Sequence, residues 1–418
     1  MVRYVCDEAD YATETTSALF RPTCRGFGRG RDALQKMAAG RCDAYKRPPT
    51  VALSATIPKS AIDAVCSDIG LDRPFIIAAS VDRHNLTYEQ KVVRRGTPFV
   101  AQVQTLAEAI RGCQDRNIIV YAVRQRHLRK LEEMLPRLLR NDRRPILVIH
   151  GSISPDEKLL RLDAFKSAEH GAIMLLNDAG SRGLDHPNLT RIFILRPPTS
   201  LADLKQIEGR AARLSDQTGT VTHLHLRQGL FETASMLRDD PRRLSRFSGI
   251  VHVEESLKHC ARSISSYYFD EIPTPLLAEA RGGCCAVCSR LNDAHGDWSQ
   301  VCVEREVPFV GDLFDALRAA AAPSSRTAPT FKIATDGHVA NSWDRTKALS
   351  VVARERIIIE LIIDGSLHLA PPGRVRGCSY AELRVNENGL VARQRRLKNR
   401  WRYFAFAPDE APPMLSQS

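Results

Sequence analysis

The chain has 418 residues, which is enough for two to four domains with sizeable cores. Hydrophobic residues make up 43% and charged residues 26%, as in ordinary globular proteins, and no apolar run reaches the roughly eighteen residues of a membrane helix, so wholesale disorder and membrane insertion are excluded. The formal net charge of +12 favours a polyanionic partner, nucleic acid before membrane.

The first residues, MVRYVCDEAD, are acidic where a secretory or organelle-targeting leader would be basic and then apolar. An intracellular, reducing location is therefore expected. In that setting the eleven cysteines are thiols or metal ligands rather than a disulfide framework.

From Val2 to Leu226 short apolar runs alternate with polar loops and longer helical segments. The runs cover residues 2–6, 50–55, 74–80, 117–123, 145–151, 172–176, 191–196 and 220–226. Residues 126–141 have leucines at spacings of three and four, which predicts an amphipathic helix. The pattern as a whole predicts parallel α/β architecture.

Beyond this region the pattern changes. Helices and cysteines dominate residues 229–303, and residues 319–330 are typical of a flexible linker. A helix is predicted from Trp343 to Ile363, followed by extended segments at 379–385 and 390–394 joined by a hairpin turn at 386–389. A winged-helix module and an unrelated small α+β cap fit this pattern equally.

The sequence Asp7-Glu8-Ala9-Asp10 directly follows an apolar run. Its carboxylates would lie at the carboxyl end of a strand, where open α/β sheets bind ligands. One carboxylate can hold Mg²⁺ there, and its neighbour can orient an attacking water. Taken alone, the tetrapeptide is more often a solvated turn.

Three polar residues, Gln206, Arg210 and Arg213, have the spacing of one helical face. Guanidinium groups suit a phosphate clamp because they are planar, permanently charged and able to bind in a bidentate manner. The alternative is a solvated basic helix face.

Several motifs occur in a fixed order along the first two hundred residues. They lie at residues 7–10, 20–22, 53–58, 82–89, 117–123, 150–157, 183–187 and 206–213. In this order they resemble the RecQ family of superfamily 2 DNA helicases. The resemblance implies a 3′→5′ DNA helicase that uses ATP and Mg²⁺, acts in DNA repair and recombination, and is nuclear, or nucleoid-associated or cytoplasmic in a prokaryote.

The resemblance also implies residue roles. Asp7 would serve the Mg²⁺, Glu8 would position and deprotonate water, and Gln206, Arg210 and Arg213 would complete the catalytic set. Residues that would couple the nucleotide to the nucleic acid are Ser54, Thr56, Gly183 and Asp185. Phe20 and Arg21 would contact single-stranded or duplex DNA, and the loop at His150 would lie against its backbone.

The family carries a helical zinc-binding subdomain after its second lobe, and the matching residues here are Cys260, Cys284, Cys285 and Cys288. The two-residue gap between Cys285 and Cys288 lets both thiolates bind one ion. His259, His295 or Cys302 could substitute for one ligand. Buried thiols without Zn²⁺ are the alternative.

A basic strip near the C-terminus interleaves cations with aromatic residues. Its predicted DNA-contact residues are Arg393, Arg395, Arg396, Arg400 and Trp401. Cations neutralise phosphates and aromatic rings stack on bases. A solvated face or a nuclear-import patch is equally consistent with this composition.

The fold class expected from these observations is α/β, with RecA-like parallel-sheet lobes of which the first is truncated, then the zinc subdomain and a small α+β, winged-helix-like module. The expected boundaries are 1–92, 93–228, 229–303, a linker at 304–342, and 343–418.

The 418 residues hold no Gly-Lys-Ser/Thr phosphate loop before Asp7, so a partial helicase chain is expected, inactive as an ATPase unless a partner chain completes lobe one. The alternatives are a non-catalytic, helicase-derived DNA-binding or regulatory protein and a DEAD-box RNA helicase.

Overall fold

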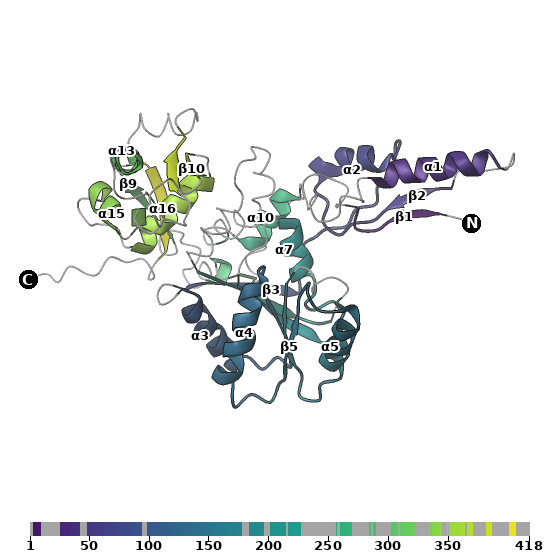
Figure 1. Ribbon diagram of the computed structural model, residues 1–418, viewed down its shortest axis with the longest axis horizontal. Coiled ribbons are helices and arrows are strands. Elements are labelled where there is room, and N and C mark those ends of the chain that lie inside the picture. The colour runs from purple at the N-terminus through teal and green to yellow at the C-terminus, as the bar shows by residue number, and fades with distance from the viewer. Residues whose placement is uncertain are drawn as a thin grey trace, which may run out of the picture.

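The computed structural model arranges the chain as an N-terminal unit, a central α/β lobe and a C-terminal unit (Figure 1). It describes residues 3–9, 26–41, 48–93, 98–177, 184–195, 201–214, 216–226, 256, 260–269, 284–285, 287–289, 302–307, 310–322, 329, 334–335, 337–344, 349, 351–363, 366–370, 382–386 and 401–406. Within these residues no helix is long and apolar enough to cross a membrane.

The central lobe is built on a sheet of six strands. They are β3 (Leu86–Val93), β4 (Asn117–Tyr121), β5 (Ile146–Ile149), β6 (Ile173–Leu176), β7 (Leu189–Ile194) and β8 (Gly219–Leu226). The spatial order is β3-β8-β7-β4-β6-β5, and every neighbouring pair is parallel. The predicted parallel α/β architecture is therefore confirmed.

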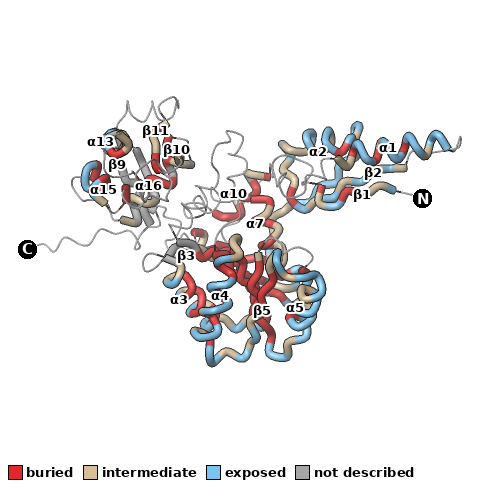
Figure 2. Tube along the Cα trace, viewed as in Figure 1, coloured by how far each residue is buried: buried red, intermediate tan, exposed pale blue. Residues whose placement is uncertain are grey.

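Helices cover both faces of this sheet, so its central strands are apolar on both sides. Helices α3 (Pro98–Arg111) and α4 (Gln125–Leu138) bury one face, where Ile118 and Val120 belong to the same core. Helices α5 (Pro155–Ser167) and α7 (Leu201–Glu208) cover the other face. The buried residues concentrate in this lobe (Figure 2).

Helix α4 is the amphipathic helix that leucine spacing predicts. Leu128, Leu131 and Leu135 are fully buried against the sheet, while Arg126 and Arg129 are exposed. Burial of each leucine contributes about 1.5–3 kcal/mol relative to leaving it in water.

The N-terminal unit has a small parallel sheet of two strands, β1 (Tyr4–Cys6) and β2 (Thr50–Ala52). Helix α1 (Phe27–Ala39), the short helix η3 (Lys59–Ala61) and helix α2 (Ile62–Ile69) accompany it. A core of Cys6, Ala9, Val65 and Ile69 joins the sheet to α2.

The strand predicted at residues 74–80 does not form, and that prediction is wrong. Among the described residues the segment has no hydrogen-bonded strand neighbour, and Phe75 and Ile77 are 90% and 88% exposed. An apolar run becomes a strand only where another strand pairs with it, and the N-terminal sheet has just two strands among the described residues.

The C-terminal unit contains two antiparallel strand pairs and three helices among the described residues. The strands are β9 (Cys302–Val307), β10 (Leu367–Ala370), β11 (Glu382–Val385) and β12 (Trp401–Phe406). The helices are α13 (Val310–Ala321), α15 (His338–Trp343) and α16 (Val351–Ile363). Strand β9 pairs with β12, and β10 pairs with β11.

Three predictions for this unit need correction. Of the helix predicted from Trp343 to Ile363, the structure has α16 at Val351–Ile363, while Trp343 is the last residue of α15, and β9 and α13 occupy residues where a linker was expected. Strand β11 pairs with β10, which follows α16, rather than with residues 390–394, which lie outside the described residues. A winged-helix module is therefore not supported, and the small α+β description remains.

Candidate functional site

The turn that follows α7 carries two of the predicted arginines. Helix α7 ends at Glu208, so Arg210 and Arg213 lie beyond it rather than on successive turns of its face, which corrects the helical prediction. Ala212 has a φ of 47°, in the left-handed region, and this ends any continuation of the helix.

Both arginines are nevertheless held against the loop that contains Asp185. Arg213 Nη1 lies 2.6 Å from Asp185 Oδ1, and Arg210 Nη1 donates to the carbonyl oxygen of Leu184 at 3.1 Å. The Ala212 amide donates to the carbonyl oxygen of Leu189, the first residue of β7, at 2.7 Å. The two arginines therefore lie at the edge of the sheet where β3, β7 and β8 begin.

Gln206 and Thr56 join the central lobe to the N-terminal unit. Gln206 Nε2 lies 3.4 Å from Thr56 Oγ1, and the Thr56 amide donates to Ser54 Oγ at 3.3 Å. Gln206, predicted to belong to the catalytic set, and Thr56, predicted to couple nucleotide and nucleic acid, are thus in contact across 150 positions of sequence.

Asp7 and Glu8 follow β1 directly, at its carboxyl end. Asp7 is exposed, and its Oδ1 accepts a hydrogen bond from the Glu8 amide at 3.0 Å. Glu8 has a φ of 51°, a conformation that costs about 1–3 kcal/mol for a residue other than glycine. These carboxylates are thus available to a cation on the N-terminal unit, whereas Arg210 and Arg213 belong to the central lobe.

A buried polar network that the sequence did not reveal lies behind the arginine turn. Lys205 Nζ lies 2.7 Å from Glu208 Oε2, and His223 Nε2 lies 3.0 Å from Glu208 Oε1. The Lys205 ammonium also lies 4.7 Å from the centre of the Tyr88 ring. Burial raises the pKa of Tyr88 to about 12, so its hydroxyl stays neutral. Burial by itself would lower the pKa of Lys205, but its interactions with Glu208 and Tyr88 together outweigh burial and raise that pKa.

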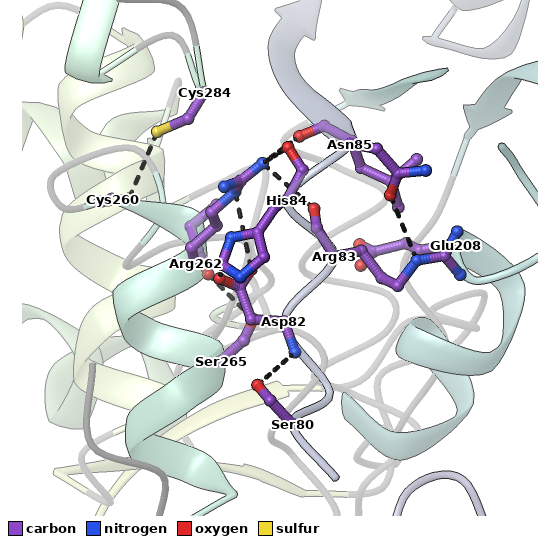
Figure 3. Close-up of polar contacts among 12 residues, drawn as sticks. Ser80, Asp82, Arg83, His84, Asn85, Glu208, Cys260, Arg262, Ser265 and Cys284 are labelled. Carbon is purple, nitrogen blue, oxygen red and sulfur yellow. Dashed lines mark hydrogen bonds and ion pairs between the residues drawn. The ribbon is translucent and has the colours of Figure 1, made fainter. Parts of the chain in front are cut away.

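The segment 82–86, which precedes and begins β3, is held by buried Arg262 of helix α10 (Ala261–Tyr268). Arg262 Nη2 donates to the carbonyl oxygens of Arg83, His84 and Leu86 at 3.1, 2.9 and 2.6 Å (Figure 3). The pattern Asp82–Glu89 and the residue Arg262 are visible in the sequence, but the contact between them is not.

The four predicted cysteines meet beside this segment. The sulfur atoms of Cys260, Cys284, Cys285 and Cys288 all lie within 4.8 Å of one another, and those of Cys260 and Cys284 are 3.8 Å apart. Hydrogen bonds from the neighbouring thiols lower the pKa of Cys260. The amide of Tyr88 donates to the carbonyl oxygen of Cys284 at 3.0 Å, which ties the cluster to β3.

A second polar group lies where β4 and β5 end. Gln125 Nε2 lies 3.1 Å from both His150 Nδ1 and Ser152 Oγ, and Gln125 is the first residue of α4. Exposed Arg126 and Arg129 belong to the first two turns of that helix. Burial and the nearby Arg129 guanidinium lower the pKa of His150.

Several predicted site residues lie outside the described residues. They are Phe20, Arg21, Gly183, Arg393, Arg395, Arg396 and Arg400. Trp401 begins β12, where the ladder pairs it with Val307 and pairs Arg402 with Glu306.

Comparison with known proteins finds a similarity to a helicase family within the central lobe. Residues 101–215 match the family described as Helicase conserved C-terminal domain. The chain is 32% identical over 108 residues to "ATP-dependent RNA helicase DBP3" of Lodderomyces elongisporus, which covers 26% of this chain and 19% of that protein. It is 28% identical over 173 residues to "ATP-dependent RNA helicase DBP2" of Chaetomium globosum, covering 40% of this chain and 30% of that protein.

Among solved structures, the chain is similar to "DEAD-box helicase Mss116 bound to ssRNA and UDP-BeF", with 17% identity and a TM-score of 0.40 over 66% of this chain and 58% of that one. The matches to both curated relatives span less than a third of their length.

These relatives overturn the RecQ resemblance. The proteins that match are named as RNA helicases, so the assignment to the RecQ family, the function as a DNA helicase in repair and recombination, and DNA as the partner are wrong. The physical reason is that carboxylates for Mg²⁺ and arginines for phosphate perform the same chemistry on either polymer. They do not distinguish ribose from deoxyribose.

Proposed function

We propose that this chain is an ATP-dependent RNA helicase of the DEAD-box kind, or a part of one. The observation that carries the proposal is the coincidence of the helicase-domain match at 101–215 with a parallel sheet whose edge presents Arg210, Arg213 and Asp185. The names of the curated relatives supply the choice of RNA.

The proposal divides the chain nearly in the way that the sequence suggests. The sequence divides a first lobe at residues 1–92 from a second at 93–228, but β3 (Leu86–Val93) belongs to the six-stranded sheet. The first lobe would therefore end before Leu86, and residues 86–228 would form the second. Residues 229–303 would form a cysteine-containing subdomain, and the C-terminal unit would follow. A nuclear or cytoplasmic location accords with the fungal relatives.

ATP with Mg²⁺ would supply the phosphoryl group for hydrolysis. The exposed Asp7 carboxylate fits a magnesium ligand, because carboxylate oxygen is a donor that Mg²⁺ prefers. Glu8 would orient water, and Arg210 and Arg213 would stabilise negative charge on phosphate oxygens. Gln206 and Thr56, which are in contact, would transmit the relative position of the two units.

The carboxyl edge of β4 and β5 would bind the RNA backbone. Arg126 and Arg129 supply exposed positive charge there, and the N-terminus of α4 adds the positive end of the helix dipole. Neutral His150, Gln125 and Ser152 add hydrogen-bonding groups suited to phosphate and ribose oxygens.

The test is fluorescence polarisation of labelled single-stranded RNA, and of DNA of the same sequence, over a salt series. Replacing Arg126 and Arg129 with alanine should weaken RNA binding and reduce the salt slope by about 0.7 for each lost phosphate contact. The matched control is Arg137→Ala, because Arg137 is an exposed arginine at the other end of the same helix.

Preference for RNA over DNA, with loss of affinity only in the Arg126 and Arg129 variants, supports the proposal. Equal affinity for DNA would contradict the choice of polymer. An equal effect of Arg137→Ala would contradict the choice of surface.

The cysteine cluster fits a structural Zn²⁺ site. A tetrahedral site with Zn–S bonds of about 2.3 Å has sulfur–sulfur edges of about 3.8 Å, which is the separation of Cys260 and Cys284. Cys260, Cys284, Cys285 and Cys288 would be the four ligands, and the metal would supply cross-linking of α10 to residues 284–288 rather than catalysis.

A further inference from the structure

The turn at residues 211–217 is clamped by two side chains from the other end of the lobe's sequence. Asn85 Nδ2 lies 2.8 Å from the carbonyl oxygen of Ala212, 2.9 Å from that of Gln217 and 3.3 Å from that of Leu214. Arg83 Nη2 donates to the carbonyl oxygens of Ala211 and Ala212. One carboxamide and one guanidinium thus satisfy four carbonyl groups of a turn that has no regular secondary structure.

Arg83 also fixes the orientation of the Asn85 carboxamide. Arg83 Nε donates to Asn85 Oδ1 at 3.3 Å, so the oxygen of the amide faces Arg83 and its NH₂ group faces the turn (Figure 3). A carboxylate at position 85 would present acceptors to acceptors, because Asp has no donor when ionised. The geometry therefore requires an amide here.

The clamp acts on a strained backbone. Ala212, the residue whose carbonyl oxygen accepts from both side chains, has a φ of 47°. A left-handed alanine persists only where its surroundings hold it, because that conformation is unfavourable for a residue other than glycine. Arg213 is the next residue, so its direction toward Asp185 depends on this backbone conformation.

The backbone that carries Arg83 and Asn85 is itself held by hydrogen bonds. Arg262 holds three carbonyl groups of residues 83–86, and the Gly219 amide donates to the Asn85 carbonyl oxygen at 2.9 Å. The side chains of Arg83 and Asn85 consequently extend from a fixed backbone on one side of the turn.

From these contacts we propose that Arg83 and Asn85 are positioning residues that hold the 211–217 turn and so aim the Arg213 guanidinium at its anionic partner. The identity of that partner as a nucleotide phosphate during the reaction rests on the proposed function. The position of the 211–217 turn in the free protein is independent of the proposed function.

The experiment is hydrogen–deuterium exchange of the full chain, without nucleotide or RNA, followed by mass spectrometry of peptides that cover residues 209–218. Asn85→Ala and Asn85→Asp should each speed exchange of the turn amides by roughly tenfold or more, since local opening is limited by these hydrogen bonds. Exchange within β4 and β6 should remain as in the unmodified chain.

The matched control is Asn117→Ala. Asn117 is a buried asparagine at the start of β4 whose Oδ1 accepts from the Ala172 amide, so its loss weakens the same lobe without touching the turn. It should not change exchange at 209–218 selectively. A rescue pair completes the design: Arg83→Lys keeps a charged donor and should leave the turn protected, whereas Arg83→Leu should not.

Unchanged exchange at 209–218 in both Asn85 variants would overturn the proposal. So would an effect of Asn117→Ala equal to theirs, because the loss of protection would then reflect general weakening of the lobe. Failure of the RNA-binding test leaves this result intact, so the two proposals fail separately.

Discussion

Arg213 and Asp185 form an ion pair of 2.6 Å between two loops that meet where β3, β7 and β8 begin. The Asp185 side chain is 72% exposed, so water and salt screen the attraction. The pair therefore directs the guanidinium without contributing much to folding.

The first prediction follows from this exposure. Asp185→Asn should change the free energy of unfolding by less than about 1 kcal/mol, the usual range for exposed ion pairs. Urea denaturation followed by circular dichroism measures it. A loss of several kcal/mol would mean that the ion pair stabilises the fold, and that Arg213 is not available to another anion.

The second prediction concerns the buried counterpart of that pair. Glu208→Gln should destabilise the lobe by about 3–5 kcal/mol, because it leaves the Lys205 ammonium buried without its carboxylate. The same urea titration measures it, with Asp185→Asn as the exposed comparison. If Glu208→Gln cost no more than Asp185→Asn, the charge of Lys205 would have to be compensated elsewhere.

The contrast between strands β4 and β3 explains which parts of the fold could be predicted. Strand β4 has apolar residues on both faces, since Ile118 and Val120 belong to one core and Ile119 and Tyr121 to the other. A continuous apolar run of this kind can be recognised from the sequence alone. Strand β3 is one of the two edge strands and contains Glu89, Gln90 and Lys91. Because of this polar composition it has no apolar strand pattern, and residues 82–89 were interpreted only as a motif.

The site divides in a similar way. Residue types with strong chemistry, such as the four cysteines and Arg213, could be singled out from the sequence, although the helical spacing expected for Arg213 was wrong. Asn85 could not be assigned a role, because its acceptors lie more than 120 positions away and are backbone carbonyl groups of ordinary residues. Backbone acceptors carry no sequence signature.

The third prediction tests the proposed Zn²⁺ site. Protein purified without chelators should contain about one zinc per chain by elemental analysis, and Cys285→Ser should lower that content. The matched control is Cys113→Ser, because Cys113 lies at the end of α3, outside the cluster. Absence of zinc from the unmodified chain would contradict the assignment. So would an equal zinc content in Cys285→Ser and Cys113→Ser.

The last prediction is a pH dependence of stability that comes from His186. This side chain is 5% exposed and packs edge-on against Phe165, with ring centres 5.0 Å apart, and its Nδ1 accepts from the Asn188 amide at 3.1 Å. Burial and the neighbouring Lys166 ammonium lower the pKa of His186, although the Asp185 carboxylate opposes them in part.

The sign of the effect follows from that direction. The unfolded chain takes up a proton at His186 near the ordinary pKa of about 6.5, whereas the folded chain does so only at lower pH, so between the two values the unfolded state binds more protons. The contribution of His186 to stability is therefore fully present above about pH 7 and declines as the pH falls below about 6.5.

Urea midpoints measured from about pH 7.5 to about pH 5.5 should fall, and less steeply in His186→Asn, which keeps an acceptor for the Asn188 amide. His170→Gln, a change at an exposed histidine, serves as the control and should leave the slope unchanged. An identical slope in His186→Asn and in the unmodified chain would show that the stability loss at acid pH arises from other groups.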